Sequence, residues 1–186
     1  MILLVGLGNP TPNSNDNRHN VGFKIIDAIN QKFALSKQKP KFKGLLTTGT
    51  IANQKVYAIK PLTFMNNSGI CIRELIEYFK INIDDVIVFH DDLDVDFGKI
   101  KAKFGGSSAG HNGIESIDKF IGKEYSRVRV GIGKPDKKDS VSDYVLNDFN
   151  DEEKTQLDQI TINIIDSIPI LIDKKLDLFS STVNNK

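Results

Sequence analysis

The sequence predicts an α/β protein with one domain over residues 1–186 and a mixed, mostly parallel central sheet flanked by helices. Three observations lead to this prediction. Short apolar runs alternate with segments whose apolar residues recur at helical spacing, as in strand–helix–strand units. The length of 186 residues fits one domain, and no internal repeat or linker divides the chain. Two strand-like segments joined by a short turn make a mixed sheet the expected arrangement.

The first elements are strongly patterned. Residues 2–5 are a continuous apolar run followed by a turn, which is typical of a strand buried on both faces. Apolar residues from Val21 to Phe33 keep helical spacing and predict a helix. Residues 45–52 and 55–60 are strand-like, and the short connection Asn53-Gln54 fits a hairpin.

The alternation continues through the middle of the chain. Residues 72–79 place apolar side chains at i, i+3, i+4 and i+7, which predicts an amphipathic helix. Residues 86–89 are again apolar throughout and predict a buried strand. Residues 99–104 alternate polar and apolar side chains, as a half-exposed strand does.

The last third carries weaker signals. A glycine-rich loop precedes a predicted helix at residues 112–120, and residues 128–132 form a further strand. The apolar stripe from Leu157 to Ile168 predicts a final helix, although Thr161 interrupts it. Pro169 is expected to close that helix because proline cannot continue one.

Composition excludes several protein classes. Hydrophobic residues make up 39% and charged residues 26%, so global disorder and a membrane-spanning class are not expected. No apolar run reaches the ~18 residues of a membrane helix. Met1 is not followed by the basic region of a signal peptide. Cys71 is the single cysteine, so we expect no disulfide, a packing role for its side chain and a cytoplasmic setting.

Charge is segregated although the net charge is only +1. Residues 28–73 contain no acidic residue, and the charged residues of the segment 99–134 are mostly basic. Such blocks predict a positive face and a polyanionic partner such as nucleic acid. The alternative is that residues 37–43 form a mobile lysine-rich loop without a partner.

Two residues are candidates for proton-transfer chemistry. His19 lies at a loop-to-helix junction rather than on an apolar face, and histidine suits a general base at neutral pH. Asp91 follows a buried strand and could orient a histidine by accepting its second N–H. A solvated acidic turn is the alternative for Asp91. No spacing matches a metal-ligand pattern, so no metal is expected.

Other polar motifs offer weaker alternatives. Residues 106–110 match the G-x-S-x-G pattern of a serine nucleophile, with Ser108 at its centre. The only later histidine, His111, is too close in the chain to serve as its base. Glycines in this loop would instead suit an anion or a closely approaching substrate. The amides of Asn9, Asn66 and Asn112 suit recognition of a peptide or ester, while a single loop asparagine is usually turn chemistry.

Six ordered stretches together carry a family resemblance. They are Val5-Gly6-Leu7-Gly8-Asn9-Pro10, Arg18-His19-Asn20-Val21-Gly22, residues 60–69 (KPLTFMNNSG), His90-Asp91-Asp92-Leu93-Asp94, Gly110-His111-Asn112-Gly113 and residues 127–133 (RVRVGIG). In this order and spacing the chain resembles bacterial peptidyl-tRNA hydrolases over most of its length.

The resemblance implies a monomeric enzyme without metal or cofactor. Its partner is peptidyl-tRNA, whose ester bond between peptide and tRNA it hydrolyses, and no membrane is involved. It implies that His19 is the general base, that Asp91 supports it and that Asn66 helps to position water and substrate. The residues implied in substrate binding are Asn9, Ser14, Phe64, Met65, Asn66 and Asn112. Those implied in contacts with tRNA phosphates are Lys101, Lys103, Arg127 and Arg129.

One segment departs from the family pattern. The family usually has Gly, Tyr and Thr where this chain has Thr11, Ser14 and Asn17. Ser14 lacks the aromatic ring of that tyrosine, so we expect altered affinity or substrate preference rather than loss of the base. Two other functions stay open on the sequence: a non-catalytic RNA-binding protein of the same fold, and a serine esterase that uses Ser108.

Overall fold

The computed structural model describes residues 1–186 and contains one seven-stranded sheet. The strands are β1 (Ile2–Gly6), β2 (Lys39–Lys41), β3 (Gly44–Ile51), β4 (Gln54–Pro61), β5 (Val86–Asp92), β6 (Ile100–Phe104) and β7 (Ser126–Gly131). Across the sheet their order is β2-β3-β4-β1-β5-β7-β6. The central pairs β4–β1, β1–β5 and β5–β7 are parallel, and the pairs toward both edges are antiparallel. The predicted fold class is therefore confirmed.

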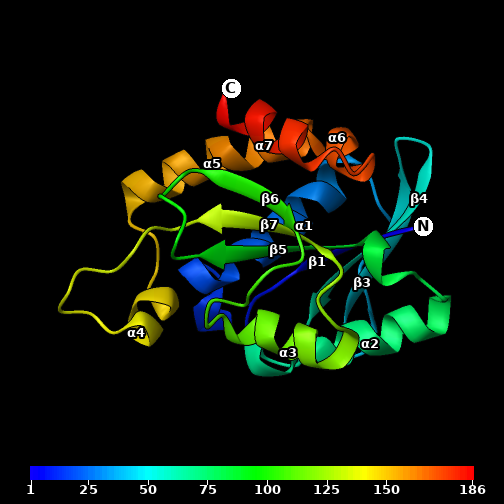
Figure 1. Ribbon diagram of the computed structural model, residues 1–186, viewed down its shortest axis with the longest axis horizontal. Coiled ribbons are helices and arrows are strands. Elements are labelled where there is room, and N and C mark those ends of the chain that lie inside the picture. The colour runs from blue at the N-terminus through cyan, green and yellow to red at the C-terminus, as the bar shows by residue number, and fades with distance from the viewer.

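Helices cover both faces of the sheet (Figure 1). They are α1 (Val21–Lys32), α2 (Ser68–Phe79), α3 (Asn112–Ile121), α4 (Val141–Leu146), α5 (Asp151–Asp166), α6 (Ile168–Ile172) and α7 (Leu176–Asn184). Helices α2 and α3 lie on one face, and α1, α5, α6 and α7 lie on the other. None of these helices is both long enough and apolar enough to span a membrane.

Strand β1 supplies side chains to both layers of the core. Ile2 and Leu4 pack into the larger apolar cluster with α1 and α5, and Leu3 and Val5 pack into the second cluster with α2 and α3. Successive side chains of a strand point to opposite faces, so a strand covered on both sides is apolar throughout. Cys71 is fully buried in the second cluster, which confirms its predicted packing role.

Two of the boundaries that differ from the sequence prediction have a clear backbone cause. The β3–β4 hairpin turns at Ala52 and Asn53, with φ of 50° and 61°, one residue earlier than expected. Two consecutive residues with positive φ are typical of the primed hairpin turns that match strand twist. Pro169 lies in the first turn of α6 instead of closing the preceding helix, because a proline in a first turn loses no helical hydrogen bond. The helix before it, α5, ends at Asp166.

The lysine-rich segment contains the edge strand β2 rather than a loop alone. Its three residues, Lys39, Pro40 and Lys41, are exposed, and Lys41 Nζ lies 4.8 Å from the centre of the Tyr78 ring. Lysine and proline on an edge strand discourage pairing with other chains. This local role explains part of the positive charge of residues 37–43 without a nucleic-acid partner.

Candidate active site

Two glycines allow helix α1 to approach the carboxyl ends of β1 and β5. A Cβ atom on Gly22 would lie 2.4 Å from Leu7 N and 2.5 Å from Phe89 O, and one on Gly6 would lie 2.2 Å from Gly22 O. Any larger residue would push the helix away from the sheet. The close approach places the 3-10 helix Arg18–Asn20, which directly precedes α1, beside the end of β5.

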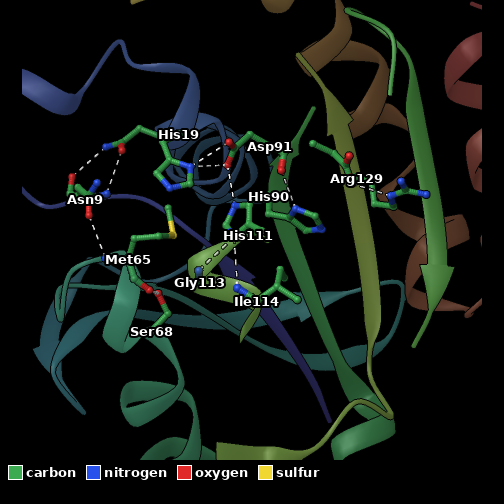
Figure 2. A network of polar contacts seen from close by, with 12 residues as sticks. Asn9, His19, Met65, Ser68, His90, Asp91, His111, Gly113, Ile114 and Arg129 are labelled. Atoms are coloured by element: carbon green, nitrogen blue, oxygen red, sulfur yellow. Dashed lines mark hydrogen bonds and ion pairs between the residues drawn. The ribbon is translucent and has the colours of Figure 1, made fainter. Parts of the chain in front are cut away.

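His19 and Asp91 meet at this point. His19 Nδ1 lies 2.9 Å from both carboxylate oxygens of Asp91, and both residues are buried (Figure 2). A carboxylate accepts, so Nδ1 carries the proton and donates it. His19 Nε2 then keeps its lone pair and has no hydrogen-bond partner in the chain. The His19 side chain lines a cavity. The arrangement is the one expected of a base oriented by a carboxylate.

A second histidine, His111, contacts the same carboxylate. Its Nε2 lies 2.9 Å from Asp91 Oδ1, and its Nδ1 accepts the backbone N–H groups of Gly113 and Ile114 (Figure 2). His111 is thereby the N-cap of α3. An Nδ1 that accepts cannot carry a proton, so Nε2 carries it and donates to Asp91. The first turn of α3 fixes the tautomer of His111.

These contacts keep Asp91 ionised. Burial by itself raises the pKa of Asp91, but the adjacent His111 and His19 outweigh burial and lower the pKa well below its usual range. Next to it, burial lowers the pKa of His90 to about 4, with a further contribution from the neighbouring His111. His90 is therefore neutral near pH 7.

The same three residues do not suit a metal ion. Potential ligand atoms of His19, Asp91 and His111 lie within 4.8 Å of one another. A histidine coordinates through a nitrogen lone pair, and the only lone pair of His111 already accepts two backbone N–H groups. The protonated Nε2 that faces Asp91 cannot serve as a ligand.

Asn9 is held so that it presents a donor to the cavity. Its Oδ1 accepts the backbone N–H of Met65 at 2.9 Å. Its own backbone N–H and C=O pair with the side chain of Asn20, both at 2.9 Å. With the oxygen and the backbone committed, the Nδ2 group of Asn9 is the part left for a substrate.

The other predicted substrate residues line the same cavity of about 890 Å³. The side chains of Asn66 and Asn112 are exposed there and have no hydrogen-bond partner in the chain. Phe64 has φ 64° and ψ 159°, a conformation that favours glycine, and the residue is 52% exposed. Met65 and Ser14 are buried in the cavity wall, where Ser14 Oγ bonds Thr11 Oγ1 at 2.5 Å.

One wall of the cavity is apolar and comes from α4, an element that the sequence pattern did not predict. The cavity-lining residues of this wall include Val141, Val145 and Leu146. Arg18 ties α4 to the segment that carries His19, because its guanidinium bonds Tyr144 O at 3.2 Å and Asn147 O at 3.3 Å. The residue before the candidate base thus also holds the cavity wall that α4 forms.

The four residues predicted to contact tRNA phosphates differ in exposure and in ion pairing. Lys101 and Lys103 on β6 are exposed and have no ion-pair partner. Arg129 is partly exposed and pairs with Asp92 at 2.7 Å. Arg127 is only 3% exposed, and its guanidinium bonds Ser107 O at 2.8 Å and Asp118 at 3.0 Å. The assignment of Arg127 to a phosphate contact is corrected, because a buried and paired guanidinium cannot reach tRNA.

Ser108 lacks the partners of a nucleophile. Its hydroxyl is 3.5 Å from Glu115 Oε1 and contacts no histidine nitrogen. Both ring nitrogens of the nearest histidine in sequence, His111, are already committed. The G-x-S-x-G match is therefore a coincidence of loop sequence.

Comparison with known proteins decides the family. The family model "Peptidyl-tRNA hydrolase" matches residues 3–186. This chain belongs to the peptidyl-tRNA hydrolase family. The peptidyl-tRNA hydrolase of Pelagibacter ubique (strain HTCC1062) is 78% identical over all of both chains, and that of Gluconobacter oxydans (strain 621H) is 42% identical over 98% of this chain and 97% of its own. The crystal structure of the Acinetobacter baumannii peptidyl-tRNA hydrolase superposes with a TM-score of 0.92 at 32% identity, covering 99% of this chain and 94% of that one.

Two features of the candidate site in this peptidyl-tRNA hydrolase do not follow from the sequence pattern. The sequence motifs suggest His111 only as a base for Ser108, although its position immediately before a predicted helix marks a potential N-cap. Helix α4 has six residues and a short apolar pattern, which gives too weak a periodicity to be predicted.

Proposed function

We propose that His19 is the general base with which this chain, as a peptidyl-tRNA hydrolase, cleaves the ester bond between a peptide and tRNA. The observation that carries the proposal is the donation of His19 Nδ1–H to Asp91, which leaves Nε2 unpaired at the cavity. A base oriented in this way contributes ~10²–10⁴-fold to a hydrolytic rate.

The reaction follows from this geometry. His19 Nε2 takes a proton from a water molecule while the water oxygen bonds to the ester carbonyl carbon. The bond from that carbon to the ribose oxygen then breaks, and the proton on Nε2 passes to the leaving oxygen. Asp91 stabilises the imidazolium that exists between the two steps. The products are free tRNA and a peptide with a carboxylate.

The cavity amides have separate roles in this proposal. Asn9 can only donate from its side chain, so it serves a carbonyl oxygen of the substrate. A donor to the developing oxyanion contributes ~3–4 kcal/mol. The unpaired amides of Asn66 and Asn112 are free to position water and to accept the N–H of a blocked amino group, which a charged free amine would not match. Ser14, Phe64 and Met65 shape the walls around the acyl group.

The tRNA contact is assigned to the exposed lysines of β6. Lys101 lies directly opposite Arg129 in the β6–β7 register, so both point to one face of the sheet. Lys103 shares that face because it is two residues further along the strand. Neutralised phosphates release counterions, so tRNA binding should weaken with salt. We further propose that residues 1–186 form a single domain that acts as a monomer in the cytoplasm without a cofactor.

The test is release of tRNA from an N-acetylated aminoacyl-tRNA in the presence of a chelator. We expect wild-type protein to release free tRNA and His19→Ala to lose at least ~10²-fold in kcat while its circular dichroism stays unchanged. Ser108→Ala is the matched control at the same cavity and should retain its turnover. Wild-type turnover in His19→Ala, or complete loss in Ser108→Ala, would contradict the proposal.

A further inference from the structure

The hydrogen bonds between β1 and β5 stop just before the active site. The last one joins Leu7 N to Phe89 O at 3.1 Å. Groups on one edge of a parallel strand recur every two residues, so the next bond in which the β1 segment donates to β5 would join Asn9 N to Asp91 O. Because β1 has ended at Gly6, that bond is missing, and the backbone donor of Asn9 and the backbone acceptor of the buried Asp91 require other partners.

Two side chains take the place of the missing bond. Asn9 N donates to Oδ1 of Asn20 at 2.9 Å. Asp91 O accepts from Nδ1 of His90 at 2.8 Å (Figure 2). The strands can therefore separate at the site without leaving either backbone group unpaired, and each substitute bond holds the backbone of a residue that faces the cavity.

We propose that His90 is a positioning residue for the hydrolysis, which fixes the main chain of Asp91 so that its carboxylate meets His19 and His111 together. The inference rests on the proposed role of Asp91 in orienting His19. His90 does not line the cavity, so it is not itself a group that touches the substrate.

The surroundings of His90 fit this role. The side chain is buried, and its ring packs edge-on against the ring of His111 with 5.0 Å between ring centres. Its Nδ1 makes its only hydrogen bond, and its Nε2 is buried without a partner. The Asp91 carbonyl oxygen can only accept, so the proton of the neutral ring lies on Nδ1. The single N–H at Nδ1 thus makes the whole polar contribution of His90.

The decisive comparison is between His90→Asn and His90→Leu. An asparagine amide nitrogen takes the place of Nδ1 and can still donate to the Asp91 carbonyl, whereas leucine fills similar space without a donor. We expect His90→Leu to lower kcat by ~10–100-fold, because small misplacements of reacting groups have effects of this size, and to change KM by less than ~3-fold. His90→Asn should recover most of kcat. The pH profile of kcat should shift in His90→Leu and not in His90→Asn.

Two controls separate this inference from the proposed function. His19→Ala is measured alongside. If His19→Ala keeps its turnover, the proposed function fails. If His19→Ala loses its activity while His90→Leu keeps the wild-type kcat, only the role of His90 is overturned. An equal loss of kcat in His90→Leu and His90→Asn would also overturn the positioning role of His90. Should His90→Leu not fold, ¹⁵N NMR of histidine-labelled wild-type protein gives the answer. We expect the Nδ1–H tautomer for His90, and an Nε2–H tautomer would refute the proposal.

Discussion

His111 donates Nε2–H to Oδ1 of Asp91, and helix α3 enforces the tautomer that makes this possible. The helix cap and the candidate active site therefore share one imidazole ring. A change at His111 alters two separable properties, the stability of α3 and the alignment of the carboxylate.

Substitutions at His111 should separate these two properties. His111→Asn keeps a good N-cap, because its Oδ1 can accept the same backbone N–H groups, but its side chain is too short to reach Asp91. His111→Ala loses both contacts. We expect both variants to lower kcat by ~10-fold or more, and only His111→Ala to lower the free energy of unfolding, by ~1 kcal/mol. Steady-state kinetics and urea titrations check this, and equal stability losses would count against the capping role.

The basic residues of β6 and β7 should fall into two classes. Replacing Lys101 or Lys103 by Gln should raise KM for tRNA substrates, leave kcat unchanged and reduce the slope of log K against log salt by about one for each lysine. Arg127→Gln should leave this slope unchanged and lower the free energy of unfolding by ~3 kcal/mol, because Asp118 loses its buried partner. Salt-dependent binding and thermal melts distinguish the classes. A reduced salt slope in Arg127→Gln would restore it as a phosphate contact.

Folding stability should fall in mildly acidic solution because of His90. Its pKa is about 4 in the folded protein and near 6.5 when exposed, so the unfolded chain binds the extra proton between these values. Stability is then highest above pH 6.5 and decreases as the pH falls toward 4, by on the order of 3 kcal/mol. His90→Asn should flatten this part of the curve. Urea unfolding at several pH values measures the effect, and an unchanged slope in the variant would contradict it.

The single thiol should be inert in the folded protein. Cys71 is fully buried, and burial raises the pKa of its thiol to about 12, so very little thiolate exists at pH 8. We expect a thiol-reactive dye to label the native protein far more slowly than the urea-unfolded protein. Rapid labelling of native protein would mean that the second core cluster opens readily.

The amino-acid sequence alone was sufficient to predict the strands and helices that depend on a local pattern of apolar residues. The all-apolar run of residues 2–5 indicates a strand covered on both faces, and the structure has it at the centre of the sheet. The apolar spacing from Val21 gives α1 with the correct start, since a long amphipathic helix has a strong period. Asp91, which follows an apolar run in the sequence, lies at the carboxyl end of β5, where it meets His19.

Tertiary structure decided which of these polar groups meet and which are covered. Arg127 and Arg129 look equivalent in the sequence, two residues apart on one strand face, yet Asp118 and Ser107 bury only Arg127. His19, Asp91 and His111 come from three distant segments, and only the close approach of α1 at Gly22 and the start of α3 bring them together. Local sequence fixes backbone preference and side-chain period, whereas burial and hydrogen-bond partners depend on contacts between segments that no local pattern encodes.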